Sequence, residues 1–201
     1  AVDVGIAAGE TVSDLLSQMK EKALAATDAS LTTAARNALN EDFVAMRKQI
    51  ASTVSNAKFN GVAVISGTAG FKALANTGGS TTIDIAAEDM SLSGSVVTLG
   101  STAQITTRTM AQARLTAVNT SIDNVSASLA RLGTGSKALG THLSFVGKLQ
   151  DTIESGIGNL VDADLAKESA RLQALQTKQQ LGVQALSIAN SSTSILLGLF
   201  R

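Results

Sequence analysis

The end of the chain, residues 162–201, reads DADLAKESARLQALQTKQQLGVQALSIANSSTSILLGLFR and contains no proline. Asp162 is suited to cap a helix, and Asp164 adds negative charge to the first turn, where free backbone N–H groups favour it. Apolar residues then recur at spacings of three, four or their sums, which places them on one side of a helix. These residues are Leu165, Leu172, Leu175, Val183, Leu186, Ala189, Leu196 and Phe200. The closing segment from Ile195 to Phe200 is too apolar for water, so the pattern predicts an amphipathic helix that needs a partner.

The composition excludes several classes of function. The 201 residues are 44% hydrophobic, but no apolar run is long enough to span a membrane, so we expect no membrane insertion. The 16 basic and 16 acidic side chains balance, so no electrostatic field draws the chain to nucleic acid. The chain has no cysteine, which excludes disulfides and thiolate metal sites, and no proline, which suits long helices.

Two helices are predicted in the first part of the chain. Apolar side chains over residues 2–26 follow helical spacing at Val12, Leu15, Leu16, Met19 and Ala23. Ser30 is a candidate N-cap for a second helix over residues 31–58. The same spacing recurs there at Leu39, Phe43, Met46, Ile50 and Val54.

The pattern changes beyond Gly61. Short apolar runs at 62–65, 73–75, 82–85 and 96–99 are separated by glycines at 67, 70, 78, 79 and 94. Runs of this length bounded by turn residues predict a small β region of strands or hairpins over residues 62–100.

A heptad repeat predicts a third helix over residues 105–160. Its a positions hold Leu115, Ile122, Leu129, Ser136, Leu143, Gln150 and Ile157, and its d positions hold Val118, Val125, Leu132, Leu139, Val146, Ile153 and Leu160. At about 1.5 Å per residue this seam is roughly 70 Å long. The predicted fold is therefore mainly α: an elongated rod of long antiparallel helices, packed as a coiled-coil-like bundle, with a small β-hairpin region and a C-terminal amphipathic helix.

No group of residues suggests catalysis, a cofactor or a metal. His142 is the only histidine and has no Asp, Glu or Cys cluster at ligand spacing around it, so we interpret it as a helix residue. The segment from Gly133 to Lys137 lacks the spacing of a phosphate-binding loop and lies inside the heptad repeat. We therefore expect no enzymatic activity.

Two blocks of sequence resemble bacterial flagellins. The acidic turn at residues 162–164 precedes Gln180, Gly182, Leu186, Ala189 and Asn190, and the chain ends in the hydrophobic run 196–201 closed by arginine. Residues 56–62 read NAKFNGV, similar to the family's F-N-G turn after the second spoke helix. The resemblance covers the chain except for residues 68–101, and it implies an exported, extracellular subunit of the flagellar filament that serves motility.

The resemblance also implies a role for each part of the chain. Residues 1–161 correspond to the spoke and residues 162–201 to the inner-core helix, while Ala1 lies after the family's N-terminal core segment, which is expected to be missing. The residues expected to pack in the filament core are Leu186, Ala189, Leu196, Leu197, Leu199 and Phe200. The spoke seam comprises Leu115, Val118, Ile122, Val125, Leu129, Leu132, Leu139, Leu143, Val146 and Ile153. The turn into the hairpin region comprises Phe59, Asn60 and Gly61.

The expected partners follow from the same resemblance. They are other flagellin copies, an export chaperone at the C-terminal helix, and the hook-associated and cap proteins. Two alternatives remain open at this point: a hook-filament junction protein, and a flagellin-like surface adhesin that binds a ligand through residues 68–101.

One stretch departs from the family pattern. Many flagellins carry L-Q-R-x-R-E-L-A on the first spoke helix, the surface seen by the innate-immune flagellin receptor. Here Gln18 replaces the first arginine, Lys20 replaces the second, and Glu21 keeps the acidic position. Glutamine has neither the charge nor the forked donors of a guanidinium, so weak receptor activation is expected.

Overall fold

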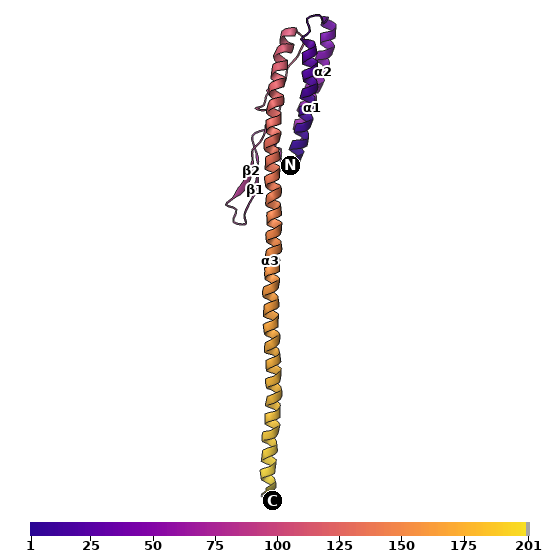
Figure 1. Cartoon of the computed structure of the whole chain (residues 1–201). Coiled ribbons are helices and arrows are strands. Elements are labelled where there is room, and N and C mark those ends of the chain that lie inside the picture. The colour runs from indigo at the N-terminus through magenta and orange to yellow at the C-terminus, as the bar shows by residue number, and fades with distance from the viewer. Residues whose placement is uncertain (200–201) are drawn as a thin grey trace. The chain divides into compact units, whose positions relative to one another are not determined.

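The computed structural model describes the backbone of residues 1–199 and the side chains of residues 1–162 and 164–190. Its elements are helix α1 (Val2–Ala26), helix α2 (Thr33–Asn56), strands β1 (Phe71–Leu74) and β2 (Thr82–Ile85), and helix α3 (Arg108–Leu199) (Figure 1). The chain divides into two compact units, Ala1–Leu143 and Ser144–Arg201, here called unit 1 and unit 2. The predicted mainly α fold with a small antiparallel hairpin is confirmed.

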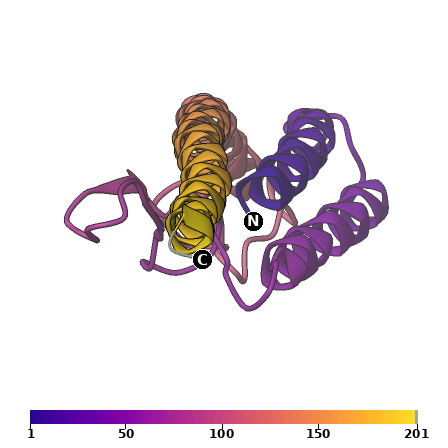
Figure 2. The same cartoon turned by 90° about the horizontal axis from the view of Figure 1, so that it is seen from below.

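The core of unit 1 lies between α1, α2 and the first part of α3. Helix α1 is placed between the other two, as Figure 2 shows from below. The predicted apolar faces of α1 and α2 bury Leu16, Met19, Phe43 and Ile50 completely. They join one cluster with Val125 of α3, so the spacing of apolar residues correctly identified the buried sides.

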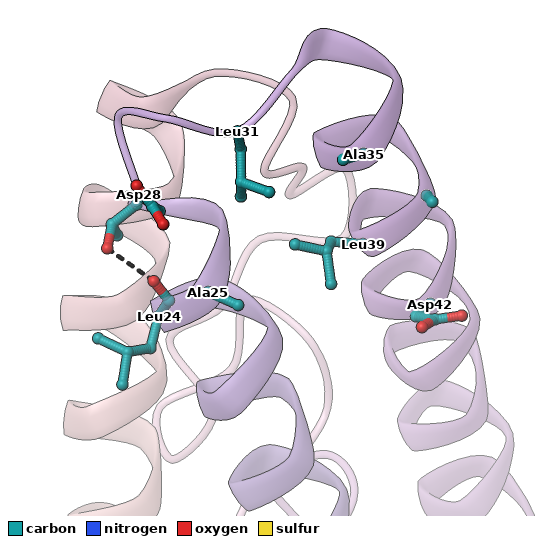
Figure 3. Close-up of a pocket in the computed structure, with 9 residues that line it drawn as sticks. Leu24, Ala25, Asp28, Leu31, Ala35, Leu39 and Asp42 are labelled. Atoms are coloured by element: carbon teal, nitrogen blue, oxygen red, sulfur yellow. Dashed lines mark hydrogen bonds between the residues drawn. The ribbon is translucent and has the colours of Figure 1, made fainter.

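The turn between α1 and α2, whose ribbon is drawn in Figure 3, is held by side chains rather than by regular structure. The Arg36 guanidinium donates to the carbonyl oxygens of Ala26, at 3.0 Å, and Asp28, at 2.8 Å. Ser30 is not the N-cap of α2, because its N–H and hydroxyl both donate to the Asp28 carboxylate at 2.8 Å. Thr32 caps the helix instead, accepting from the N–H of Ala35 at 3.2 Å.

Two glycines let other segments approach α1 closely. A Cβ atom added at Gly5 would lie 2.3 Å from Val64 Cγ2, and one added at Gly9 would lie 2.8 Å from Leu129 Cδ2. Both distances are well below van der Waals contact, so the buried loop residue Val64 and the helix residue Leu129 occupy the space that larger side chains would need.

The β region is much smaller than predicted. Only β1 and β2 form strands, paired antiparallel with Phe71 opposite Ile85, and the Asn76 side chain accepts from the N–H groups of Ser80 and Thr81 at the loop. In unit 1, a Cβ atom at Gly135 of α3 would lie 2.9 Å from Ile85 Cδ1, so this glycine makes room for the hairpin.

The predicted strands at 62–65 and 96–99 are wrong. Val64, Ile65, Val97 and Leu99 are fully buried, but they belong to an irregular segment that lies in the helical core. Helix side chains provide some of the backbone bonds that a ladder would supply: Asn124 donates to the carbonyl oxygen of Val96 at 3.1 Å. Burial of an apolar run therefore did not require a strand here.

The segment that leads into α3 is held in the same way. The buried Arg47 guanidinium of α2 donates to the carbonyl oxygen of Ala103, and the Asn40 side chain accepts from the N–H of Ile105 at 2.8 Å. These bonds keep Ile105 outside the helix, which begins at Arg108 instead of residue 105.

Helix α3 is continuous where two helices were predicted. Asp162 lies in its interior, so the predicted N-cap there is wrong. Without proline the backbone hydrogen bonds are uninterrupted, and an interior aspartate disfavours a helix by only about 0.7 kcal/mol relative to alanine. The proposed division after residue 161 is thus not marked by any break in the helix.

Candidate functional site

The apolar heptad residues of α3 from Leu115 to Leu139 lie against the core of unit 1. The d residues Val118, Val125 and Leu132 are buried, and four further seam residues pack against the same cluster in partly buried positions. These four are Leu115, Ile122, Leu129 and Leu139. The a position at 136 is polar. The hydroxyl of Ser136 donates a hydrogen bond to the Asp3 carboxylate of α1 at 2.8 Å, so this polar group has a partner within the bundle.

The remaining seam residues are not covered. Leu143 at the end of unit 1 is 74% exposed, and Val146 and Ile153 of unit 2 are also exposed. Among residues 144–190 the only regular element is α3 itself, so no other element within this range packs against its apolar side.

Unit 2 presents a long apolar surface. We call it the unit 2 stripe and define it as Leu149, Ile153, Ile157, Leu160, Leu165, Leu172, Leu175, Val183 and Leu186, all of which are exposed. Soluble monomers rarely expose contiguous apolar patches larger than a few hundred Å². Of the predicted core-packing residues, Leu186 and Ala189 are exposed, while the side chains of Leu196, Leu197, Leu199 and Phe200 lie outside the described residues.

Few charges accompany the second half of this surface. Between residues 172 and 190 the only charged side chain is Lys178, and glutamines occupy five of the polar positions. An interfacial membrane helix needs a charged face with Lys or Arg, which this segment lacks. No helix among the described residues has the length and apolar character needed to cross a membrane.

The predicted turn at Phe59, Asn60 and Gly61 forms a tight hairpin. Phe59 and Val62 exchange backbone hydrogen bonds of 2.9 Å in both directions. Asn60 has a φ angle of 50° and Gly61 one of 79°, the left-handed values that a two-residue hairpin requires and that favour Asn-Gly. Phe59 is 58% exposed at the start of this rigid turn.

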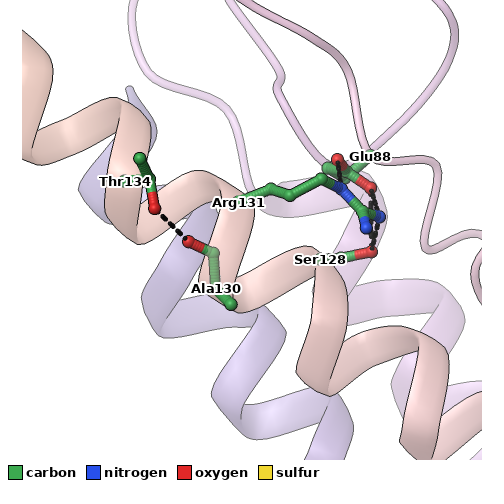
Figure 4. A network of polar contacts seen from close by, with 5 residues as sticks. All are labelled: Glu88, Ser128, Ala130, Arg131 and Thr134. Carbon is green, nitrogen blue, oxygen red and sulfur yellow. Dashed lines mark hydrogen bonds and ion pairs between the residues drawn. The ribbon is translucent and has the colours of Figure 1, made fainter.

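A buried carboxylate ties the irregular segment to α3 (Figure 4). Glu88 is 7% exposed and accepts from Arg131 Nε at 2.5 Å, from Arg131 Nη2 at 2.6 Å and from Ser128 Oγ at 2.8 Å. The Arg131 hydrogen bonds lower the pKa of Glu88 below its usual value, and burial opposes them only in part. No spacing in the sequence signalled this cluster, because its members lie about forty positions apart.

We expect the hydrogen bonds of Glu88 to make the free energy of unfolding of unit 1 depend on pH. Because the folded-state pKa of Glu88 is depressed, its contribution is complete above its unfolded pKa of about 4.3 and is lost as the pH falls through the folded value. Urea unfolding from pH 7 to pH 3 should show Glu88→Gln less stable than the wild type at pH 7, with the difference shrinking at low pH. A pH-independent difference would contradict this linkage.

No catalytic arrangement emerges from the described part of the chain. No three His, Cys, Asp or Glu side chains among these residues lie close enough to hold a metal ion. The prominent features are apolar surfaces, which are suited to packing.

Comparison with known proteins decides the family. The sequence profile of the bacterial flagellin N-terminal helical region matches residues 1–70, and that of the C-terminal helical region matches residues 115–200. Flagellin FljO of Caulobacter vibrioides is 54% identical over all of this chain and 72% of its own length. The chain belongs to the flagellin family. Flagellin FljN of the same organism is 56% identical over the same shares.

The solved structure of Bacillus cereus flagellin has the same fold. It superposes with a TM-score of 0.62 over 71% of this flagellin and 82% of that chain, at 22% identity. The sequence-based recognition is confirmed, as is the function: this flagellin is a structural subunit of the extracellular bacterial flagellar filament, in which it assembles with other flagellin copies. Neither a junction protein nor an adhesin is favoured by any of the relatives.

The three residues that the sequence analysis assigned to a receptor surface lie on the exposed side of α1. Gln18, Lys20 and Glu21 are exposed, while the neighbouring Leu16 and Met19 are buried in the core. The neighbouring Lys22 forms an ion pair of 2.7 Å with Asp42 of α2. The three residues are thus accessible to a large partner.

Proposed function

We propose that this flagellin joins the inner part of the filament through the unit 2 stripe. The observation that supports the proposal is the exposure of nine large apolar side chains on a helix that no other described part of unit 2 covers. Burying one such side chain contributes about 1.5–3 kcal/mol, whereas association costs about 4–15 kcal/mol. Several stripe residues must therefore be covered at once, as in a tube of packed helices.

The stripe extends to the core-packing residues inferred from the family resemblance. Leu186 and Ala189 lie on α3, and Leu196, Leu197, Leu199 and Phe200 continue the same spacing in the sequence. We infer that residues 162–201 form the inner-core part. Residues 1–161 form the spoke, whose seam in unit 1 holds α3 beside α1.

Before assembly, the apolar side chains of the unit 2 stripe also need a partner protein that covers them. An amphipathic helix is commonly bound in an apolar groove of another protein. We infer that an export chaperone covers the C-terminal part of α3 until the subunit is exported. Hook-associated and cap proteins meet the subunits at the ends of the filament.

A single charged substitution tests whether filament assembly buries the unit 2 stripe. We expect Leu175→Glu to abolish filaments in cells whose flagellin is replaced by the variant, because assembly would bury an unpaired carboxylate. The control is Gln173→Glu, which adds the same charge two residues away on another side of the helix and should leave filaments intact. Electron microscopy scores the filaments, and circular dichroism checks that the monomers keep their helices. Normal filaments from Leu175→Glu would reject the proposal.

The exposed receptor surface supports a second expectation. We infer that the substitutions at Gln18 and Lys20 weaken activation of the flagellin receptor, because neither side chain offers a guanidinium fork. The double variant Gln18→Arg, Lys20→Arg should activate receptor reporter cells more strongly than the wild type. Full potency of the wild-type protein would contradict the inference.

A further inference from the structure

An apolar pocket lies at one end of unit 1. It has a volume of about 670 Å³ between the end of α1, the turn and the start of α2. In Figure 3, Ala25, Leu31 and Leu39 face the space between the two helices. The other lining residues are Leu24, Thr27, Asp28, Ala35, Ala38 and Asp42. The only charged residues that line the pocket are therefore Asp28 and Asp42, with Arg36 bonded to the Asp28 carbonyl oxygen and Lys22 paired with Asp42 beside it.

An apolar projection lies at the opposite end of unit 1. The pocket involves the start of α2, whereas the turn at Phe59 follows its end. The pocket lining extends along α2 to Asp42, so the 14 residues from 43 to 56 separate the two by about 21 Å. The mutual hydrogen bonds between Phe59 and Val62 hold the turn rigid, and the exposed Lys58 precedes the ring.

We propose that Phe59 of one flagellin copy enters the pocket lined by Leu31 and Leu39 of the next copy. Phe59 cannot reach the pocket of its own chain across the part of α2 that follows Asp42, so in this contact the pocket belongs to another molecule. A contact between unlike surfaces at opposite ends of a subunit builds an open filament when its rotation does not close into a ring, so this contact is compatible with filament growth. The proposal rests on the filament role and assigns this contact to unit 1 residues, separate from the unit 2 stripe.

Size and charge both favour this occupant. Aromatic side chains bury about 150–250 Å², and a pocket of this volume accepts the ring together with the neighbouring turn atoms. Lys58 would then lie near the carboxylates of Asp42 and Asp28, of which Asp28 also accepts from the N–H and hydroxyl of Ser30. Asp42 already pairs with Lys22, but exposed ion pairs contribute only about 0–1 kcal/mol, so sharing this carboxylate costs little.

The chain has no native cysteine, so introduced cysteines are the only thiols that can form a disulfide between copies. We would express Ala25→Cys, Phe59→Cys in cells as the only flagellin, collect the filaments, oxidise them and separate the protein without reductant. Both positions are exposed, so folding should be unaffected. The expected result is a ladder of covalent multimers that reductant collapses to monomer.

Matched variants determine what the ladder means. Each single cysteine variant should stay monomeric, as should Phe59→Cys combined with Gln49→Cys, which places the second thiol at an exposed position of α2 outside the pocket. Normal filaments without a ladder would overturn the proposal while leaving the use of the unit 2 stripe intact. A product that stops at dimers would also overturn it, because the contact would then close between two copies.

A second variant tests the contribution of the ring itself. Filaments of Phe59→Ser should dissociate at a lower temperature than wild-type filaments, while the melting temperature of the monomer should not change. Phe59→Trp should retain most of the filament stability because it keeps a large apolar ring. An unchanged dissociation temperature for Phe59→Ser would overturn the proposal.

Discussion

Phe43→Ala is expected to lower the free energy of unfolding of unit 1 by about 3–5 kcal/mol. Phe43 is fully buried in the core shared by α1, α2 and α3, and alanine would leave a cavity there that packed helices cannot close completely. Urea unfolding of the monomer, followed by circular dichroism at neutral pH, measures the change. A loss of this size is a large fraction of the 5–15 kcal/mol typical of a folded domain.

The chain provides a matched control for that prediction. Phe59→Ala removes the same atoms from an exposed position, so the monomer should change by no more than about 0.5 kcal/mol. Equal losses at the two positions would show that the core assignment is wrong. If the proposed contact between copies holds, the same control variant should still weaken the assembled filament.

Gly5→Val should also destabilise unit 1, by about 1–3 kcal/mol or more. The new side chain would collide with Val64, whose Cγ2 atom lies 2.3 Å from the position of the Cβ atom. Val64 is fully buried and β-branched, so it has little freedom to move aside. Denaturant unfolding of the monomer measures this loss.

The control for this variant is the same change at Gly133 of α3. No atom lies within 4 Å of a Cβ added there, so only helix propensity changes, which favours valine over glycine by a few tenths of a kcal/mol. The two substitutions should therefore shift stability in opposite directions. Destabilisation of similar size at both positions would mean that helix propensity, rather than the close approach of Val64, sets the cost.

The helices were predictable because their signal is local. The buried residues of α1 and α2 recur every three or four positions, and a helix places such residues on one face whatever lies beyond it. The Asn-Gly turn was predictable for a similar reason, since its backbone angles depend on the two residues themselves. The recognisable flagellin blocks added the function, which the physical pattern alone did not reveal.

The irregular segment and its anchors were not predictable in this way. Val64 and Val97 read as strand residues, yet their segment is held by side chains of α2 and α3. Glu88 and Arg131 meet only because a loop crosses a helix, and Gly5 matters only because Val64 lies against it. Each of these contacts joins positions far apart in the chain, which no periodicity records.

The amino-acid sequence by itself determined that this flagellin is helical, which side of each helix is apolar, and where the chain makes its tight turn, because backbone geometry converts local spacing into faces. Only the tertiary structure decided which parts of those faces are covered. The same heptad pattern is buried at Val125 and exposed at Ile153, since burial depends on whether another element lies alongside. That difference makes one apolar seam a core in unit 1 and an exposed surface in unit 2, which we propose is buried on assembly.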